Sequence, residues 1–130
     1  MNPDKTNQDS SNTTNQRARE SKLKREQRAK ALTVAEEDLN AVYEYWLEVM
    51  RPSRRGRKLV LDDRRRLKIG AAIHDYGVED CCKAIDGCAR SDFHMGRNRM
   101  GKRYDDLELI FRDQDHIERF LGLADQGDNW

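Results

Sequence analysis

Residues 78–89, VEDCCKAIDGCA, decide the fold of this chain because they carry its clearest helical pattern. Apolar side chains recur there every three or four residues, at Val78, Cys81, Cys82, Ile85 and Cys88. That spacing places them on one side of an α-helix. Cysteine is often buried and packs as a small apolar side chain. The stretch therefore predicts a short helix with one face turned towards a core.

Two further helices are predicted upstream of this stretch. A helix over residues 62–77 has Asp62 as its N-cap and Gly77, a residue suited to a left-handed cap, at its end. Before it, an apolar stripe indicates an amphipathic helix over residues 34–50, and Pro52 ends that helix because proline disfavours helix in the preceding residue.

Downstream, a loop with two glycines leads to apolar residues on one side of residues 105–112 and again of residues 115–123. No convincing alternating strand pattern is found. The predicted fold is all-α, a small bundle of four to five short helices over residues 31–124, with a flexible C-terminus at residues 125–130.

The first 30 residues differ in composition from the rest. They are rich in Asn, Ser, Thr, Gln and charge, and Leu23 is their only large aliphatic residue after Met1. Such a segment buries too little apolar surface to offset the entropy of ordering its backbone. We therefore expect residues 1–30 to form a disordered polar and basic tail, in which residues 17–30 can fray into helix.

Charge is strongly segregated along the chain. The net charge of +1 hides residues 51–68, where nine Lys or Arg stand against two Asp. The flanking segments, residues 31–50 and the residues after Tyr104, are acidic. A cluster of one sign attracts polyanions such as nucleic-acid backbones, although a solvated helix surface is the simpler explanation. The predicted phosphate contacts are Arg54, Arg55, Arg57, Lys58, Arg64, Arg65 and Lys68.

A second basic cluster, with a net charge of +4, occupies residues 90–104. Its predicted phosphate contacts are Arg97, Arg99, Lys102 and Arg103. Phe93 and Tyr104 are candidates for base stacking, although the favoured interpretation is that both rings anchor the ends of the loop in the core. The stronger hypothesis places DNA on the linker half of the first cluster, residues 51–58, with the loop as its partner.

No catalytic or metal-binding motif accompanies these clusters. The cysteines lack CxxC spacing, and His94 has no nucleophile arranged beside it, so an ordering role in the loop is expected. Asp105 and Asp106 are interpreted as helix-capping residues. No transmembrane segment or signal peptide is evident, and three cysteines fit a reducing cytoplasm. We expect a non-enzymatic protein without cofactors or membrane contact.

Several stretches together resemble a known family. VYEYWLEVM, a basic linker, DDRRRLKIGAAIHDYGVEDCCKAIDGC, RYDDLELIFRD and HIERFL follow one another as in the C-terminal helical domain of phage replication proteins, which is similar to the DnaD-like primosomal module. The resemblance covers roughly residues 42–121. Its most specific parts are YGVEDCCKAIDGC and FHMGRNRMGKRYDDLELIFRD.

The resemblance implies a role in phage DNA replication in the cytoplasm of a bacterial host. Such domains bind DNA, often single-stranded, and help to deliver the replicative helicase during primosome assembly. By this resemblance, the segment led by Tyr104 corresponds to an aromatic-led DNA-contacting helix. Family members usually carry an N-terminal winged helix, where this chain has its polar tail, so an accessory or loader module is expected.

Two other functions are compatible with the sequence. The acidic helices around residues 36–48 and 105–118 can dock a helicase or a host factor, which would make the chain a protein-interaction adapter or inhibitor. Helices meeting at Gly77 also allow a helix-turn-helix regulator. Glu79, Asp80 and Asp86 argue against the regulator, because a recognition helix needs Arg, Asn or Gln near DNA.

Overall fold

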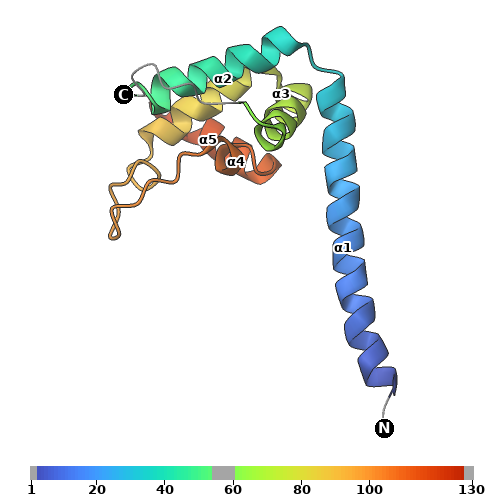
Figure 1. Ribbon diagram of the computed structural model, residues 1–130. Coiled ribbons are helices and arrows are strands. Elements are labelled where there is room, and N and C mark those ends of the chain that lie inside the picture. The colour runs from blue at the N-terminus through green and yellow to red at the C-terminus, as the bar shows by residue number, and fades with distance from the viewer. Residues whose placement is uncertain (1–2, 54–60, 128–130) are drawn as a thin grey trace.

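The computed structural model describes residues 3–53 and 61–127, and all regular elements in these ranges are helices (Figure 1). In chain order they are α1 (Pro3–Leu32), α2 (Glu36–Met50), α3 (Asp63–Arg90), α4 (Leu107–Ile110) and α5 (Gln114–Gly127). The predicted all-α class is confirmed. None of these helices is long and apolar enough to cross a membrane.

Helix α3 is the centre of the bundle, and α1, α2, α4 and α5 all pack against it. The fully buried side chains come from α2, α3, α4 and α5 and include Trp46, Ile69, Ile85, Leu107 and Phe120. Burial raises the pKa of the Cys81 and Cys88 thiols to about 12. These two cysteines are therefore protonated at neutral pH and belong to the apolar core.

Both ends of the first half of α3 follow from identifiable residues. The Asp62 carboxylate accepts a hydrogen bond of 2.9 Å from the backbone N–H of Arg65, as its predicted N-cap role requires. Gly77 interrupts the helix with φ 88° and ψ 166°. This is an extended conformation open almost only to glycine, rather than the left-handed cap that was expected. The predicted division at Gly77 is thus confirmed, because α3 consists of two helical halves that meet at this non-helical residue.

The second half of α3 approaches α5 closely at Gly87. A Cβ atom added to Gly87 would collide with the carbonyl oxygen of Phe120 and lie 2.6 Å from its carbonyl carbon. Only glycine leaves room for the α5 backbone at this position. Helix α5 runs to Gly127, so it extends beyond both the predicted helix end at residue 123 and the predicted domain boundary at residue 124.

The N-terminal region differs from the disordered tail that was expected, because residues 3–32 form helix α1. After Pro3 the segment lacks proline and glycine. From Gln16 onwards its many Arg, Lys, Glu, Gln and Ala residues favour helix, whereas residues 6–15 are mostly Asn, Ser, Thr and Asp, which favour it less. Its last turns pack on α3, where Gly70 lies so close to Ala31 that an added Cβ would be 2.5 Å from the Ala31 Cβ. Lys30 also pairs with Asp75 at 3.0 Å.

Candidate nucleic-acid interface

The second basic cluster lies in a hairpin-like loop between α3 and α4, here called the hairpin loop (residues 91–106). Met95 and Arg103 form an isolated antiparallel bridge across it, and the Tyr104 N–H donates a 2.7 Å hydrogen bond to the His94 carbonyl. In Figure 1 the loop projects from the bundle on the side away from α1. It therefore presents its tip, residues 97–102, to the surroundings.

Asn98 organises this tip. Its side-chain amide donates to the carbonyls of Phe93 and Lys102 at 2.7 and 2.6 Å. Its carbonyl oxygen accepts from the backbone N–H groups of Met100 and Lys102 at 3.0 and 3.2 Å. One side chain thus ties both arms of the loop together. Sequence reasoning missed Asn98, although asparagine is a common turn residue for this reason.

Replacing Asn98 with alanine is expected to loosen the tip without unfolding the bundle, because all four hydrogen bonds lie within the loop. Hydrogen exchange at the Met100 and Lys102 amides should accelerate about tenfold or more, as expected for losing about 1–2 kcal/mol locally. The free energy of global unfolding should change by less than about 1 kcal/mol. Asn98→Asp keeps only the acceptor, so its Met100 and Lys102 amides should exchange at rates between those of the wild type and Asn98→Ala. Unchanged amide exchange would contradict this role.

Two aromatic rings stack at the base of the tip. The Phe93 and Tyr104 rings are nearly parallel, with centroids 5.4 Å apart, and the Lys102 ammonium lies 5.5 Å from the Tyr104 centroid. Phe93 is 56% exposed, whereas Tyr104 is half-buried, and neither belongs to the core cluster. Phe93 therefore offers an accessible ring, while Tyr104 supports it from behind.

His94 connects this stack to the core. Its ring makes edge-on contacts with Phe93 at 5.3 Å and with Phe120 at 4.9 Å, and its Nδ1 lies 2.7 Å from the Ser91 hydroxyl. Burial, with smaller contributions from Arg119 and His116, lowers the pKa of His94. His94 is thus a neutral residue at pH 7 whose contacts agree with the expected ordering role.

Asp105 is the buried centre of the loop's base, not the cap that was expected. Its carboxylate, 5% exposed, accepts two hydrogen bonds from Arg51, at 2.7 and 3.2 Å, and one of 2.9 Å from Arg103 Nε. The Trp46 indole N–H donates to the Asp105 carbonyl at 2.8 Å. Asp106 does cap α4 through the Glu108 N–H, as expected.

This network joins the two basic segments of the sequence. Arg51, where the first cluster begins, meets Arg103 of the hairpin loop at the same carboxylate. The Arg51 and Arg65 guanidinium groups lie 4.7 and 5.7 Å from the Trp46 ring centroid. Burial acts to raise the pKa of Asp105, but hydrogen bonds and charge from Arg51 and Arg103 outweigh it and hold the pKa below its ordinary value.

The predicted phosphate contacts of the first cluster are divided by the structure. Arg54, Arg55, Arg57 and Lys58 lie outside the described residues. On α3, Arg64 is 3.6 Å from Glu108 and Arg65 is 3.9 Å from Asp106. Lys68 is partly buried on the α1 side, which lowers its pKa, and it donates to the Arg112 carbonyl at 3.3 Å. The cations on α3 therefore face acidic neighbours or α1.

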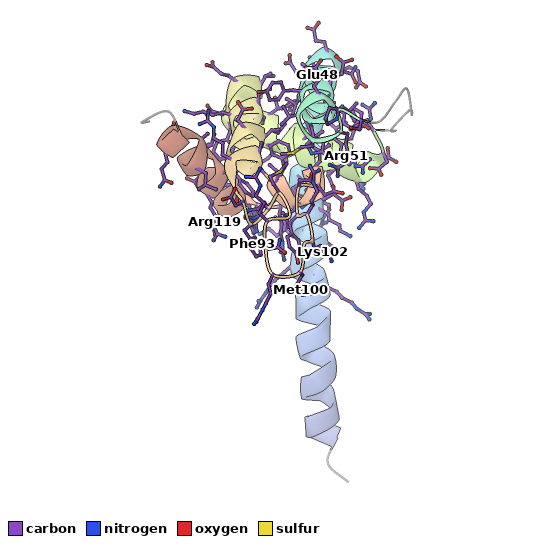
Figure 2. All side chains as sticks on the ribbon, turned by 90° about the vertical axis from the view of Figure 1, so that its left-hand side faces the viewer. Glu48, Arg51, Phe93, Met100, Lys102 and Arg119 are labelled. Carbon is purple, nitrogen blue, oxygen red and sulfur yellow. The ribbon has the colours of Figure 1, made fainter. Side chains whose placement is uncertain are left out.

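The contacts predicted in the hairpin loop are more accessible. Arg97 pairs with Asp92 at 2.8 Å, but both side chains are more than 70% exposed. Arg99 and Lys102 are also exposed, and Met100, 81% exposed, lies at the tip (Figure 2). Arg103 is the exception because Asp105 engages its guanidinium.

Figure 2 adds a residue that the sequence analysis did not single out. Arg119 of α5 lies beside Phe93, and Arg51 lies above the hairpin loop on the same side. The described part of the chain contains no cluster of His, Cys, Asp and Glu able to hold a metal ion. The hairpin loop, Arg51 and Arg119 place several cations and the Phe93 ring on one side of the molecule.

Comparison of the chain with protein-family models, curated protein sequences and solved structures finds no match. The resemblance to the DnaD-like primosomal module stays a prediction from the quoted motifs.

Proposed function

We propose that this chain is a non-enzymatic DNA-binding accessory protein of phage DNA replication that helps in primosome assembly or helicase loading. The observation that carries the DNA-binding part is the hairpin loop, which presents exposed cations and an exposed ring on an ordered backbone. The link to replication comes from the family resemblance.

Single-stranded DNA fits the hairpin loop better than a duplex does. Arg97, Arg99 and Lys102 supply positive charge for the backbone, and Phe93 supplies a face on which an unpaired base can stack. Stacking of this kind tolerates any base, which suits a protein acting on DNA that has already been opened. The predicted linker contacts at residues 54–58 follow Arg51, which lies beside the loop.

Binding to single-stranded DNA is expected to weaken steeply with salt. Replacing Arg97, Arg99 and Lys102 together with glutamine should reduce the log–log salt slope by about 2, because each phosphate contact contributes about 0.7 on a single strand. Phe93→Ala should weaken binding by about 1–3 kcal/mol while leaving the slope unchanged. Fluorescence anisotropy with labelled oligo-dT from 50 to 300 mM salt measures both quantities.

A charge-matched pair controls this experiment. Arg99→Gln and Lys83→Gln each remove one positive charge, but Lys83 pairs with Asp125 of α5 and lies outside the hairpin loop. Only Arg99→Gln should reduce affinity for the single strand. Equal effects of the two substitutions, or a wild-type slope near zero, would remove the proposed interface.

The adapter function is the second candidate, and the charge of α2 favours it. Helix α2 contains five acidic residues and no basic one, and Glu37, Glu44 and Glu48 are exposed. Such a surface suits a basic patch on a helicase or host factor. Co-purification of a replicative helicase from nuclease-treated extract would favour the adapter, whereas loss of retention after nuclease treatment would favour DNA.

The structure contains no observation that favours the helix-turn-helix regulator. That motif needs a turn of three or four residues between its helices, whereas α3 is interrupted at a single residue, Gly77. Asp86 on the second half of α3 also accepts a hydrogen bond from the Tyr45 hydroxyl of α2. This half of α3 is part of the packed bundle.

A further inference from the structure

The second half of α1 has the longest run of exposed cations in the described chain. Residues 17–30 contain seven Lys or Arg and two Glu. Lys30 pairs with Asp75, but no ion pair joins the other six cations to any side chain that the structure describes. These six are Arg17, Arg19, Lys22, Lys24, Arg25 and Arg28. Their charge is available to an external polyanion.

The six cations are distributed around the helix. With 3.6 residues per turn, Arg17, Lys24 and Arg28 lie along one side, whereas Arg19, Lys22 and Arg25 spread over the opposite side. Leu23 is the only large apolar residue among residues 17–30. A membrane-surface helix needs a continuous apolar face and a coiled coil needs an apolar seam, so neither partner fits this segment.

We propose that residues 17–25 of α1 form a duplex-binding arm that lies along the major groove of DNA and contacts backbone phosphates through its outward side. The major groove is about 12 Å wide and accepts a helix about 10–12 Å across. Lys24 and Arg28 line the groove between α1 and α3, so the cations that can reach the phosphates are Arg17, Arg19, Lys22 and Arg25. This proposal rests on the DNA-binding function proposed above and names its substrate.

The arm has a defined position relative to the hairpin loop. The end of α1 is fixed to α3 by the Ala31–Gly70 approach and the Lys30–Asp75 ion pair. Figure 1 shows α1 and the hairpin loop at opposite edges of the bundle, both projecting to the same side. A duplex bound to the arm and a single strand bound to the hairpin loop would together form a single-strand–duplex junction. DNA of this kind is the substrate class that we infer.

The test uses the full chain with Arg17, Arg19, Lys22 and Arg25 replaced by glutamine. Glutamine preserves helix propensity, and these four residues do not line the grooves between α1 and the bundle. The probes are a blunt 25-base-pair duplex, oligo-dT, and a partial duplex with a single-stranded extension. The salt slope on the duplex should fall by about 3.6, at about 0.9 per phosphate contact, and duplex affinity at 0.1 M salt by about 100-fold or more.

Oligo-dT affinity should fall much less, and the wild type should prefer the partial duplex to either other probe. A charge-matched control compares Arg19→Gln/Lys22→Gln with Lys83→Gln/Arg112→Gln, and only the first pair should weaken duplex binding. Equal losses in both pairs, or an unchanged duplex slope in the fourfold variant, would overturn the arm while leaving oligo-dT binding, and thus the proposed function, intact. A wild type that binds none of the three probes would overturn both.

Discussion

Replacing Arg51 and Arg103 together with glutamine is expected to lower the free energy of unfolding by about 3–5 kcal/mol at pH 7. The substitutions leave the Asp105 carboxylate, which is 5% exposed, without a cation. They also remove the guanidinium that packs on the Trp46 ring. Urea denaturation measures the loss.

The same variant should show an altered pH dependence. In the wild type the pKa of Asp105 is depressed, so its stabilising contribution is present above the unfolded pKa of about 3.9 and is lost as pH falls through the folded pKa. Without the arginines, burial raises the folded pKa instead. The stability difference between wild type and variant should therefore narrow as pH falls from the variant's raised pKa, above about 4, to the wild type's lowered pKa.

Arg97→Gln is the control for this experiment, because it breaks the exposed pair with Asp92. It should cost less than about 1 kcal/mol and show no comparable pH dependence. Asp105 would not hold the loop's base together if the Arg51/Arg103 double variant lost no more stability than Arg97→Gln. The same would follow if the stability difference between the double variant and wild type did not change with pH.

Gly87→Ala is expected to destabilise the chain by about 3 kcal/mol or more. The added methyl group would overlap the backbone carbonyl of Phe120, which cannot rotate away as a flexible side chain could. Helix α5 would have to shift, and it carries Ile117 and Phe120 in the core and Arg119 beside the hairpin loop. Thermal and urea unfolding measure the effect.

Gly122→Ala is the matched control because Gly122 lies in α5, where an added Cβ meets nothing within 4 Å. It should stabilise the chain by about 0.5–1 kcal/mol through helix propensity. If the two alanine variants changed stability equally, the close α3–α5 approach would be wrong.

The bundle was largely predictable because its signals are local. Apolar spacing identified α2 and both halves of α3, and residue chemistry identified the Asp62 cap and the break at Gly77. The extent of α1 was missed because low hydropathy indicates only that a segment lacks a core. Helix formers over residues 16–31 favoured its second half, but residues 6–15 are mostly weak helix formers and gave no local signal for the first.

The site was less predictable because its decisive contacts join residues far apart in the sequence. Nothing in the local pattern around Asp105 indicates that Arg51 and Trp46 reach it, so a capping role was the reasonable local interpretation. The same reasoning counted Arg103 with the other loop cations. Packing determines which arginines are used inside the protein and which stay available to a ligand.

The contact between Gly87 and Phe120 also bears on how this protein can evolve. It holds α3 and α5 together, so residues 91–113 form a connection whose two ends are fixed on the bundle. Lengthening such a connection costs little conformational entropy, about 0.6 kcal/mol for each doubling of its length. Insertions and substitutions near residues 97–102 can thus alter ligand preference while the scaffold stays unchanged, which makes this segment the natural place for related chains to diverge.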